Sequence, residues 1–273
     1  MERTCSGHKV VPLKEEEMSE KMKDFKGYQG EEMVRLQPGG WLFPSSFTRF
    51  CDKIYNFKVK PEDVFIVAWP KCGTTWTQEI VWTMRNNPKL DNPLANSPMS
   101  ARVYFLEYDV FRSSKQHGPV SPDHPTMVLF RKMCPGKNSQ DGIYLQICEA
   151  AHEPRTIKSH LPLSLLPPDL TKEAKVIYVA RNPKDVVISF CHHCRMFKRH
   201  SYEGSFEDFV KYFTEDAMVY GPYWLNVKEA WERKDDPNLH FILYEDLQSD
   251  NMEELIKLNK FLGTQLSSEQ LEK

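Results

Sequence analysis

Residues 64–76 read VFIVAWPKCGTTW, and this stretch decides the fold class. Its first half, residues 64–69, is a continuous apolar run rich in β-branched side chains, which is typical of a strand buried on both faces. The chain then turns through Pro-Lys-Cys-Gly, and apolar residues recur at helical spacing at Trp76, Ile80 and Met84. The stretch therefore predicts a buried strand, a tight loop and a helix.

The loop between this strand and this helix has the parts of an anion-binding site. Gly73 lets the backbone approach an anion closely, and Thr74 and Thr75 offer hydroxyl donors. Lys71 adds a positive charge, and the first turn of the helix directs free N–H groups to the same point. The lysine precedes the glycine, so the order differs from the G-x-x-x-x-G-K-[ST] pattern of nucleotide kinases. We predict a phosphate-binding loop here rather than a simple surface turn.

Further strands and helices alternate along the rest of the chain. Three more strands are predicted at 155–160, which ends in polar residues, and at 175–180 and 239–244, which are mostly apolar. Residues 86–142 are rich in Pro, Asn, Ser and Gly, so we expect long loops and short helices over one face. The alternation predicts an α/β fold, a P-loop-like parallel sheet flanked by helices on both faces. We expect a single domain over residues 1–273, with residues 1–37 partly irregular.

Composition and charge limit the possible functions. The chain has 36 basic and 38 acidic side chains and a formal net charge of -2, which argues against a nucleic-acid partner. No run of about 18 apolar residues occurs, and the first residues are charged, so we expect no membrane span and no secretion signal. The seven scattered cysteines predict reduced thiols in the cytoplasm. Residues 191–194, Cys-His-His-Cys, have no second ligand pair at suitable spacing, so no metal site is expected.

Four segments, in this order, resemble the cytosolic sulfotransferase family. Residues 69–76 are similar to its 5′-phosphosulfate loop and residues 157–162 to its catalytic segment. Residues 178–189 are similar to its 3′-phosphate site, and residues 244–246 to a segment beside its adenine pocket. The resemblance covers about residues 38 to 263. Residues 41–44 look closer to the invertebrate branch of the family, which includes retinol dehydratase.

The resemblance implies that the donor is 3′-phosphoadenosine 5′-phosphosulfate and that no metal is needed. Lys71 would hold the bridging and 5′-phosphate oxygens, with further donors from Cys72, Gly73, Thr74 and Thr75. The other implied donor contacts are adenine stacking by Trp76, 3′-phosphate binding by Arg181 and Ser189, and adenine binding by Tyr244. Arginine suits a phosphate because its N–H donors are paired in a planar fork.

The resemblance also assigns catalytic roles. His160 would be the general base for the acceptor hydroxyl, with Lys158 and Lys71 beside the developing negative charge. A neutral histidine suits proton removal near pH 7, and a lysine placed where charge develops stabilises the transition state most. An isolated histidine is more often structural, but His160 stands at a predicted strand end two residues after Lys158.

The acceptor implied by the family is a small hydroxyl compound, such as an alcohol, a phenol or a sterol-like molecule. Phe43, Tyr104 and Phe105 fall where the family lines its acceptor pocket with aromatic residues, although core packing would explain them equally well. His193 lies beyond Ser189 on the same predicted helix and is a further candidate for this pocket.

The sequence departs from the family pattern at two places. Cys72 stands where serine is common, and a thiol at a helix N-terminus is expected to have a lowered pKa and to oxidise. The family continues past the helix that ends near Gly263, with an Arg-Lys-Gly segment for the 3′-phosphate, a cap and a dimer contact. This sequence ends at Lys273. Either the sequence is truncated, or it is a short form for which we expect weaker donor binding. A homodimer is possible, although the dimer segment of the family is absent.

Three alternatives to an active sulfotransferase stay open from the sequence. The first is a nucleotide-binding protein with weak or no turnover, because of the missing C-terminal segment. The second is a P-loop kinase, which the absent G-K-[ST] order and the lack of an obvious magnesium-binding carboxylate disfavour. The third is the reaction of retinol dehydratase, which uses the same donor and eliminates the sulfated intermediate.

Overall fold

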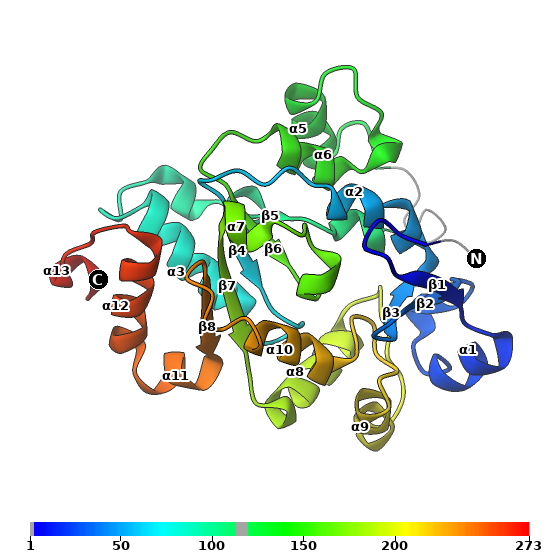
Figure 1. Cartoon of the computed structure of the whole chain (residues 1–273). Coiled ribbons are helices and arrows are strands. Elements are labelled where there is room, and N and C mark those ends of the chain that lie inside the picture. Colours follow the sequence, from blue (N-terminus) through cyan, green and yellow to red (C-terminus); the bar gives the residue numbers. More distant parts are fainter. Residues whose placement is uncertain (1–2, 113–119, 273) are drawn as a thin grey trace.

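A central five-stranded parallel sheet organises the molecule (Figure 1). The structure is a computed structural model that describes residues 3–112 and 120–272. The strands follow the order β5-β6-β4-β7-β8, and every neighbouring pair is parallel. Their bounds are β4 Val64–Val67, β5 Tyr104–Phe105, β6 Thr156–Ser159, β7 Lys175–Ala180 and β8 Leu239–Leu243. The predicted α/β fold with a parallel sheet is confirmed.

Helices cover both faces of this sheet, as predicted. On one face, α3 (Thr74–Asn86) packs on β4 and β6, and α12 (Asn251–Leu262) packs beside α3. On the other face lie α7 (Leu170–Glu173) and α10 (Tyr223–Trp231), which Figure 1 places across the sheet from α3. Between β7 and β8 also lie α8 Pro183–Met196 and α9 Phe206–Thr214, and α11 Tyr244–Ser249 and α13 Ser268–Leu271 follow β8.

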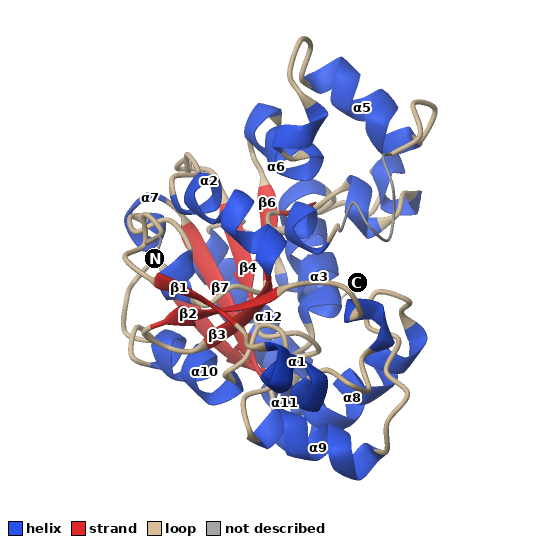
Figure 2. Ribbon diagram, turned by 90° about the vertical axis from the view of Figure 1, so that its right-hand side faces the viewer, coloured by secondary structure: helices blue, strands red, loops and turns tan. Residues whose placement is uncertain are grey.

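The N-terminal region is more regular than the sequence suggested. β1 (Lys9–Pro12), β2 (Met33–Gln37) and β3 (Trp41–Pro44) form an antiparallel sheet, and α1 (Glu15–Lys21) connects the first two strands. Figure 2 shows this small sheet in front of the central one. Within the segment expected to be partly irregular, strands occupy residues 9–12 and 33–37. The sheet is ordered because side chains such as Leu36 and Trp41 are fully buried in the main core.

Short helices fill the described part of residues 86–142, as expected. The longest in this region is α5 (Pro125–Met133), which packs on α6 (Ile143–Ala150) through a separate apolar cluster. That cluster comprises Phe130, Cys134, Ile143 and Ile147. Nearer the N-terminus, α2 (Cys51–Tyr55) precedes β4. Within residues 3–112 and 120–272, no helix combines the length and the apolar character that a membrane span requires.

Candidate active site

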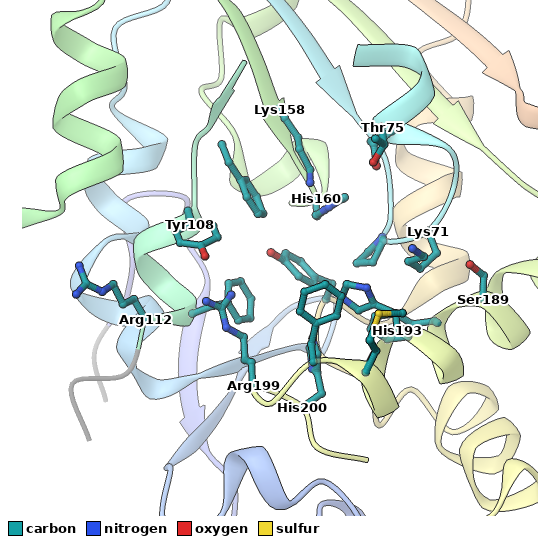
Figure 3. Close-up of a pocket in the computed structure, with 18 of the residues that line it drawn as sticks. Lys71, Thr75, Tyr108, Arg112, Lys158, His160, Ser189, His193, Arg199 and His200 are labelled. Atoms are coloured by element: carbon teal, nitrogen blue, oxygen red, sulfur yellow. The ribbon is translucent and has the colours of Figure 1, made fainter. Parts of the chain in front are cut away.

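A cavity of about 1000 Å³ lies at the carboxyl ends of the central strands (Figure 3). Lys71 follows β4, His160 follows β6 and Arg181 follows β7, and all three line the cavity. They meet because the carboxyl ends of parallel strands lie at one edge of a sheet, where open α/β sheets bind ligands. The other predicted site residues that line it are Gly73, Thr74, Thr75, Trp76, Phe105, Lys158, Ser189, His193 and Tyr244.

The loop after β4 has a backbone that suits an anion-binding role. Lys71 and Gly73 both adopt positive φ, 71° and 101°, and Gly73 is the N-cap of α3. A Cβ at Gly73 would clash with the ring of Tyr244. Glycine is therefore required for the backbone conformation and for the close approach of α11. The loop brings the first turn of a 13-residue helix to the cavity, which favours a bound anion.

Arg181 contacts the loop after β4, and one of its N–H donors is unused. Its Nη1 donates to the Lys71 carbonyl at 3.2 Å, and its guanidinium lies 4.4 Å from the centre of the Tyr244 ring. Its Nε is buried and has no hydrogen-bond partner among the described residues. A buried N–H without an acceptor is costly, so this arginine fits a site whose acceptor is supplied by a ligand.

Two aromatic rings form a platform near this arginine. Trp76 is 36% exposed and meets Tyr244 edge to face, with ring centroids 5.9 Å apart. Both rings line the cavity. An exposed indole beside a phosphate-type site is suited to stack on a flat base.

The hydrogen bonding of His160 fixes its tautomer. Nδ1 lies 2.6 Å from the Ala68 carbonyl, and because a carbonyl oxygen only accepts, Nδ1 must carry the proton. Nε2 is then left with a lone pair. Burial lowers the pKa of His160 well below its usual value, and the nearby charge of Lys158 lowers this pKa further. The ring is therefore neutral at neutral pH and able to accept a proton.

A buried carboxylate, Glu107, supports this histidine from behind. Its Oε1 accepts the backbone N–H of His160 at 2.6 Å, and its Oε2 has no partner among the described residues. Desolvation raises the pKa of Glu107, and it also lowers the pKa of Lys158, whose charge is near. Sequence reasoning missed Glu107. A charged residue directly after the apolar run 103–106 was the available signal.

The aromatic candidates for the acceptor pocket divide between cavity and core. Phe105 and His193 line the cavity, but the structure does not bring Phe43 or Tyr104 to it, so both predictions were wrong. Phe43 is fully buried one layer behind the cavity-lining Tyr220, with ring centroids 5.6 Å apart. Tyr104 packs against the α5–α6 cluster, because neighbouring residues of a strand point to opposite faces.

Cys72 also differs from its predicted role. It is fully buried, does not line the cavity, and its N–H donates to the Trp69 carbonyl at 3.4 Å. Burial raises the pKa of its thiol, so the expected lowered pKa and ready oxidation were wrong. The side chain fills space under the loop, where a small apolar group packs well.

Several lining residues were not predicted from the sequence. They are Tyr108, Phe111, Arg112, Tyr144, Tyr220 and Arg199. The first three lie on one 3₁₀ turn and its end, and their position next to Phe105 in the sequence was the only signal. The others reach the cavity from distant segments. Residues of the described ranges form no cluster of three or more His, Cys, Asp or Glu side chains suited to a metal ion.

Comparison with known proteins agrees with this geometry. The model of the sulfotransferase domain family matches residues 61–273. Sulfotransferase 1A1 of Mus musculus is 34% identical over 224 residues, which cover 82% of this chain and 67% of that protein. Luciferin sulfotransferase of Photinus pyralis is 30% identical over 230 residues, 83% of this chain and 58% of that protein. The chain belongs to the sulfotransferase family, so the resemblance to this family is confirmed.

Solved structures give the same assignment. Retinol dehydratase in complex with retinol and PAP is 30% identical, has a TM-score of 0.82, and is matched over 97% of this chain and 78% of that one. Mouse sulfotransferase 7A1 complexed with PAP is 23% identical with a TM-score of 0.61, and it shows the fold alone. The protein is thus an enzyme that transfers a sulfuryl group to the hydroxyl group of a small molecule.

Proposed function

We propose that the donor is 3′-phosphoadenosine 5′-phosphosulfate and that the acceptor is a largely hydrophobic alcohol or phenol. Two structural relatives at 30–31% identity were solved with PAP, together with retinol or with androsterone. In this chain, the unsatisfied Nε of Arg181, the Trp76–Tyr244 platform and the loop at Lys71 fit such a nucleotide. Ser189 lies on the same side of the cavity as Lys71 in Figure 3 and completes the proposed 3′-phosphate site.

The proposed reaction is a direct transfer. The acceptor oxygen forms a bond to sulfur while the bond from sulfur to the 5′-phosphate oxygen breaks, and the hydroxyl proton moves to Nε2 of His160. The products are a sulfate ester and adenosine 3′,5′-bisphosphate. Lys71 and Lys158 stabilise the charge that builds on the departing phosphate, which lowers the transition state more than the ground state. Glu107 and the Ala68 carbonyl hold His160 in position.

The observation that carries this proposal is the placement of His160. Its ring, with Nε2 unprotonated, lies between the loop at Lys71 and the aromatic wall that includes Phe105. The ring centroids of His160 and Phe105 are 5.5 Å apart. The test is incubation of the purified chain with the donor and a panel of hydroxyl compounds, without divalent metal, followed by mass spectrometry of the products. Sulfate esters are expected. Strict dependence on magnesium and use of ATP would contradict the proposal and favour a kinase.

A second candidate is elimination of the sulfated product, since the structural match to retinol dehydratase is extensive. It requires the same donor site and the same first step. Product analysis separates the two, because elimination yields a dehydrated compound and free sulfate whereas simple transfer leaves a stable sulfate ester.

The same proposal covers the domain and the location of the protein. We propose one sulfotransferase domain for residues 1–273, because β3 shares a hydrophobic core with β4 and β7. We also propose a cytoplasmic location, which the seven unpaired cysteines support.

Removal of either donor-site cation is expected to weaken nucleotide binding. Lys71→Ala and Arg181→Ala should each reduce affinity for adenosine 3′,5′-bisphosphate by about 1.5–3 kcal/mol, the usual contribution of a hydrogen bond to a charged group. Isothermal titration calorimetry measures the effect. Lys184→Ala is the control, because Lys184 is an exposed cation near the start of α8 that does not line the cavity. Unchanged affinity in both site variants would contradict the donor assignment.

The pH profile of kcat/KM should be broad and limited by two of these groups. His160 must be neutral, and its pKa is lowered by burial, so activity should persist as the pH falls below 6.5. Lys158 must be protonated, and its pKa is lowered by desolvation, so activity should fall before the pH reaches 10.5. Lys158→Arg should move the alkaline limb upward, because arginine keeps its charge. An alkaline limb that stays in place would exclude Lys158 as its cause.

A further inference from the structure

Among the described residues, the charged side chains that line the cavity are all basic. Its lining residues include six cations and, within the described part of the chain, no aspartate or glutamate. The cations are Lys71, Arg112, Lys158, Arg181, Lys198 and Arg199. Lys71, Lys158 and Arg181 are accounted for by the donor phosphates and the departing charge. Arg112 directly follows the 3₁₀ turn Tyr108–Phe111, and Lys198 and Arg199 follow α8, so these three come from segments other than the phosphate-binding loop.

Arg199 is the cation of this second group that lies on the aromatic rings of the cavity lining. Figure 3 shows its side chain directed toward Tyr108, on the side of the cavity opposite Ser189. The guanidinium carbon lies 5.1 Å from the centre of the Tyr108 ring and 5.6 Å from that of Phe111. Within the described residues this guanidinium makes no ion pair and no hydrogen bond. An arginine on two aromatic faces, with its donors unused, is suited to receive an anion.

The backbone around Arg199 is firmly held, so the position of the cation is built into the fold. The N–H of Gly27 donates to the His200 carbonyl at 3.0 Å, and the N–H of Lys26 donates to the Ser201 carbonyl at 3.1 Å. A Cβ at Gly27 would clash with the Arg199 carbonyl, so only glycine permits this approach. His200 is also tied, through Nδ1, to the hydroxyl of Tyr28 at 2.9 Å.

This arrangement concentrates positive charge beside two histidines, His193 and His200, which are neutral at neutral pH. The pKa of His193 is lowered to about 4, mainly by burial and further by the charges of Lys71, Lys158 and Arg199. Burial likewise lowers the pKa of His200 to about 3, with the charge of Arg199 contributing. A negative group bound at Arg199 would reduce the electrostatic repulsion among the cations of the cavity.

The wall between His160 and Arg199 is aromatic. The ring of Phe105 lies 5.5 Å from that of His160 and 5.5 Å from that of Tyr108, on which Arg199 rests. A compound that presents its hydroxyl to His160 would therefore lay an apolar body along Phe105 and Tyr108. Its far end would reach the arginine.

We propose that the acceptor is an amphipathic hydroxy acid, with the hydroxyl at one end, an aromatic or other apolar body, and a carboxylate that pairs with Arg199 at the other end. This proposal rests on the proposed function, since it places the hydroxyl at His160. The carboxylate takes no part in the transfer and leaves unchanged in the sulfated product.

The test compares acids with their methyl esters. A series of 4-hydroxyphenylalkanoates of increasing chain length, each paired with its methyl ester, is titrated by calorimetry into the protein saturated with adenosine 3′,5′-bisphosphate. At the best chain length, the acid is expected to bind about ten- to a hundredfold more tightly than its ester, as for a hydrogen bond to a charged group. Arg199→Gln should abolish this preference, and Arg199→Lys should retain part of it.

Arg195→Gln is the matched control. Arg195 lies on α8, is exposed, and does not line the cavity, so its loss should leave the preference for the acid intact. Wild-type protein that binds ester and acid equally, or binds neither, at every chain length would overturn the proposal. Equal loss of acid and ester binding in Arg199→Gln would also overturn it, because Arg199 would then act only by packing on Tyr108 and Phe111.

Turnover is measured separately so that the two proposals can fail separately. Sulfation of the esters or of other neutral alcohols supports the proposed function even if the acids gain nothing. Absence of sulfation for every compound would contradict the proposed function, whereas the binding ratio of acid to ester still decides the role of Arg199.

Discussion

His160→Ala is expected to lower turnover by about 10²–10⁴, the usual contribution of a positioned general base. The reason is the fixed tautomer: with Nδ1 donating to the Ala68 carbonyl, Nε2 is the lone pair available for the hydroxyl proton. Affinity for adenosine 3′,5′-bisphosphate should change little, because the donor contacts proposed above come from other residues. Steady-state kinetics and calorimetry on the same preparations measure the two quantities.

The control for this variant is His192→Ala. His192 is exposed on α8 and does not line the cavity, so its loss should leave turnover close to that of the wild type. If His160→Ala retained turnover within about threefold of the wild type, His160 would be excluded as the base.

Asp63→Ala is expected to destabilise the folded protein by about 3–5 kcal/mol, because it leaves a buried arginine without its counter-charge. The side chains of Arg155 and Asp63 are 1% and 0% exposed, and Arg155 Nε donates to Asp63 Oδ1 at 2.7 Å. Asp63 also accepts the backbone N–H of Lys60 at 2.8 Å. The pair lies at the amino ends of β4 and β6, where the N–H of Val64 donates to the Arg155 carbonyl.

Urea unfolding measures this loss, and an exposed ion pair provides the control. Lys53 and Asp141 pair at 2.9 Å with side chains 44% and 59% exposed, so Lys53→Ala should cost less than about 1 kcal/mol. The pair of Arg155 and Asp63 lies at the opposite end of the strands from the cavity, so activity per folded molecule should persist in Asp63→Ala. A loss of stability no larger than that of Lys53→Ala would contradict the structural role of the pair.

The sequence predicted four of the five central strands, most clearly β4 and β7, which are apolar runs buried on both faces. It did not predict β5, which has only two residues. The run 64–69 and the loop after it are local signals, and so is the placement of His160 and Arg181 at strand ends. The N-terminal sheet was missed because β1 and β2 carry Lys9 and Arg35, and only tertiary contacts cover their apolar side chains.

The acceptor half of the cavity was harder to predict for a related reason. Phe43 and Tyr220 are both aromatic, and only the packing of β3 on the loop at 220–221 decides which ring faces the cavity. Arg199 lies in a polar stretch after α8 and resembles any surface cation in sequence. Its function depends on contacts with residues 26–28, which are far away along the chain.

The backbone N–H groups of Lys26 and Gly27 donate hydrogen bonds to the carbonyls of residues 201 and 200. An N-terminal segment thus supports the part of the cavity wall that contains Arg199. The proposed reacting groups lie in or after the central strands, whereas this N-terminal segment, with no proposed reacting group, holds the wall that we propose contacts the acceptor. Variation in that segment can therefore alter substrate preference while the chemistry is inherited unchanged. An exchange of residues 24–31 with those of a relative would be a route to new acceptors that leaves every catalytic side chain in place.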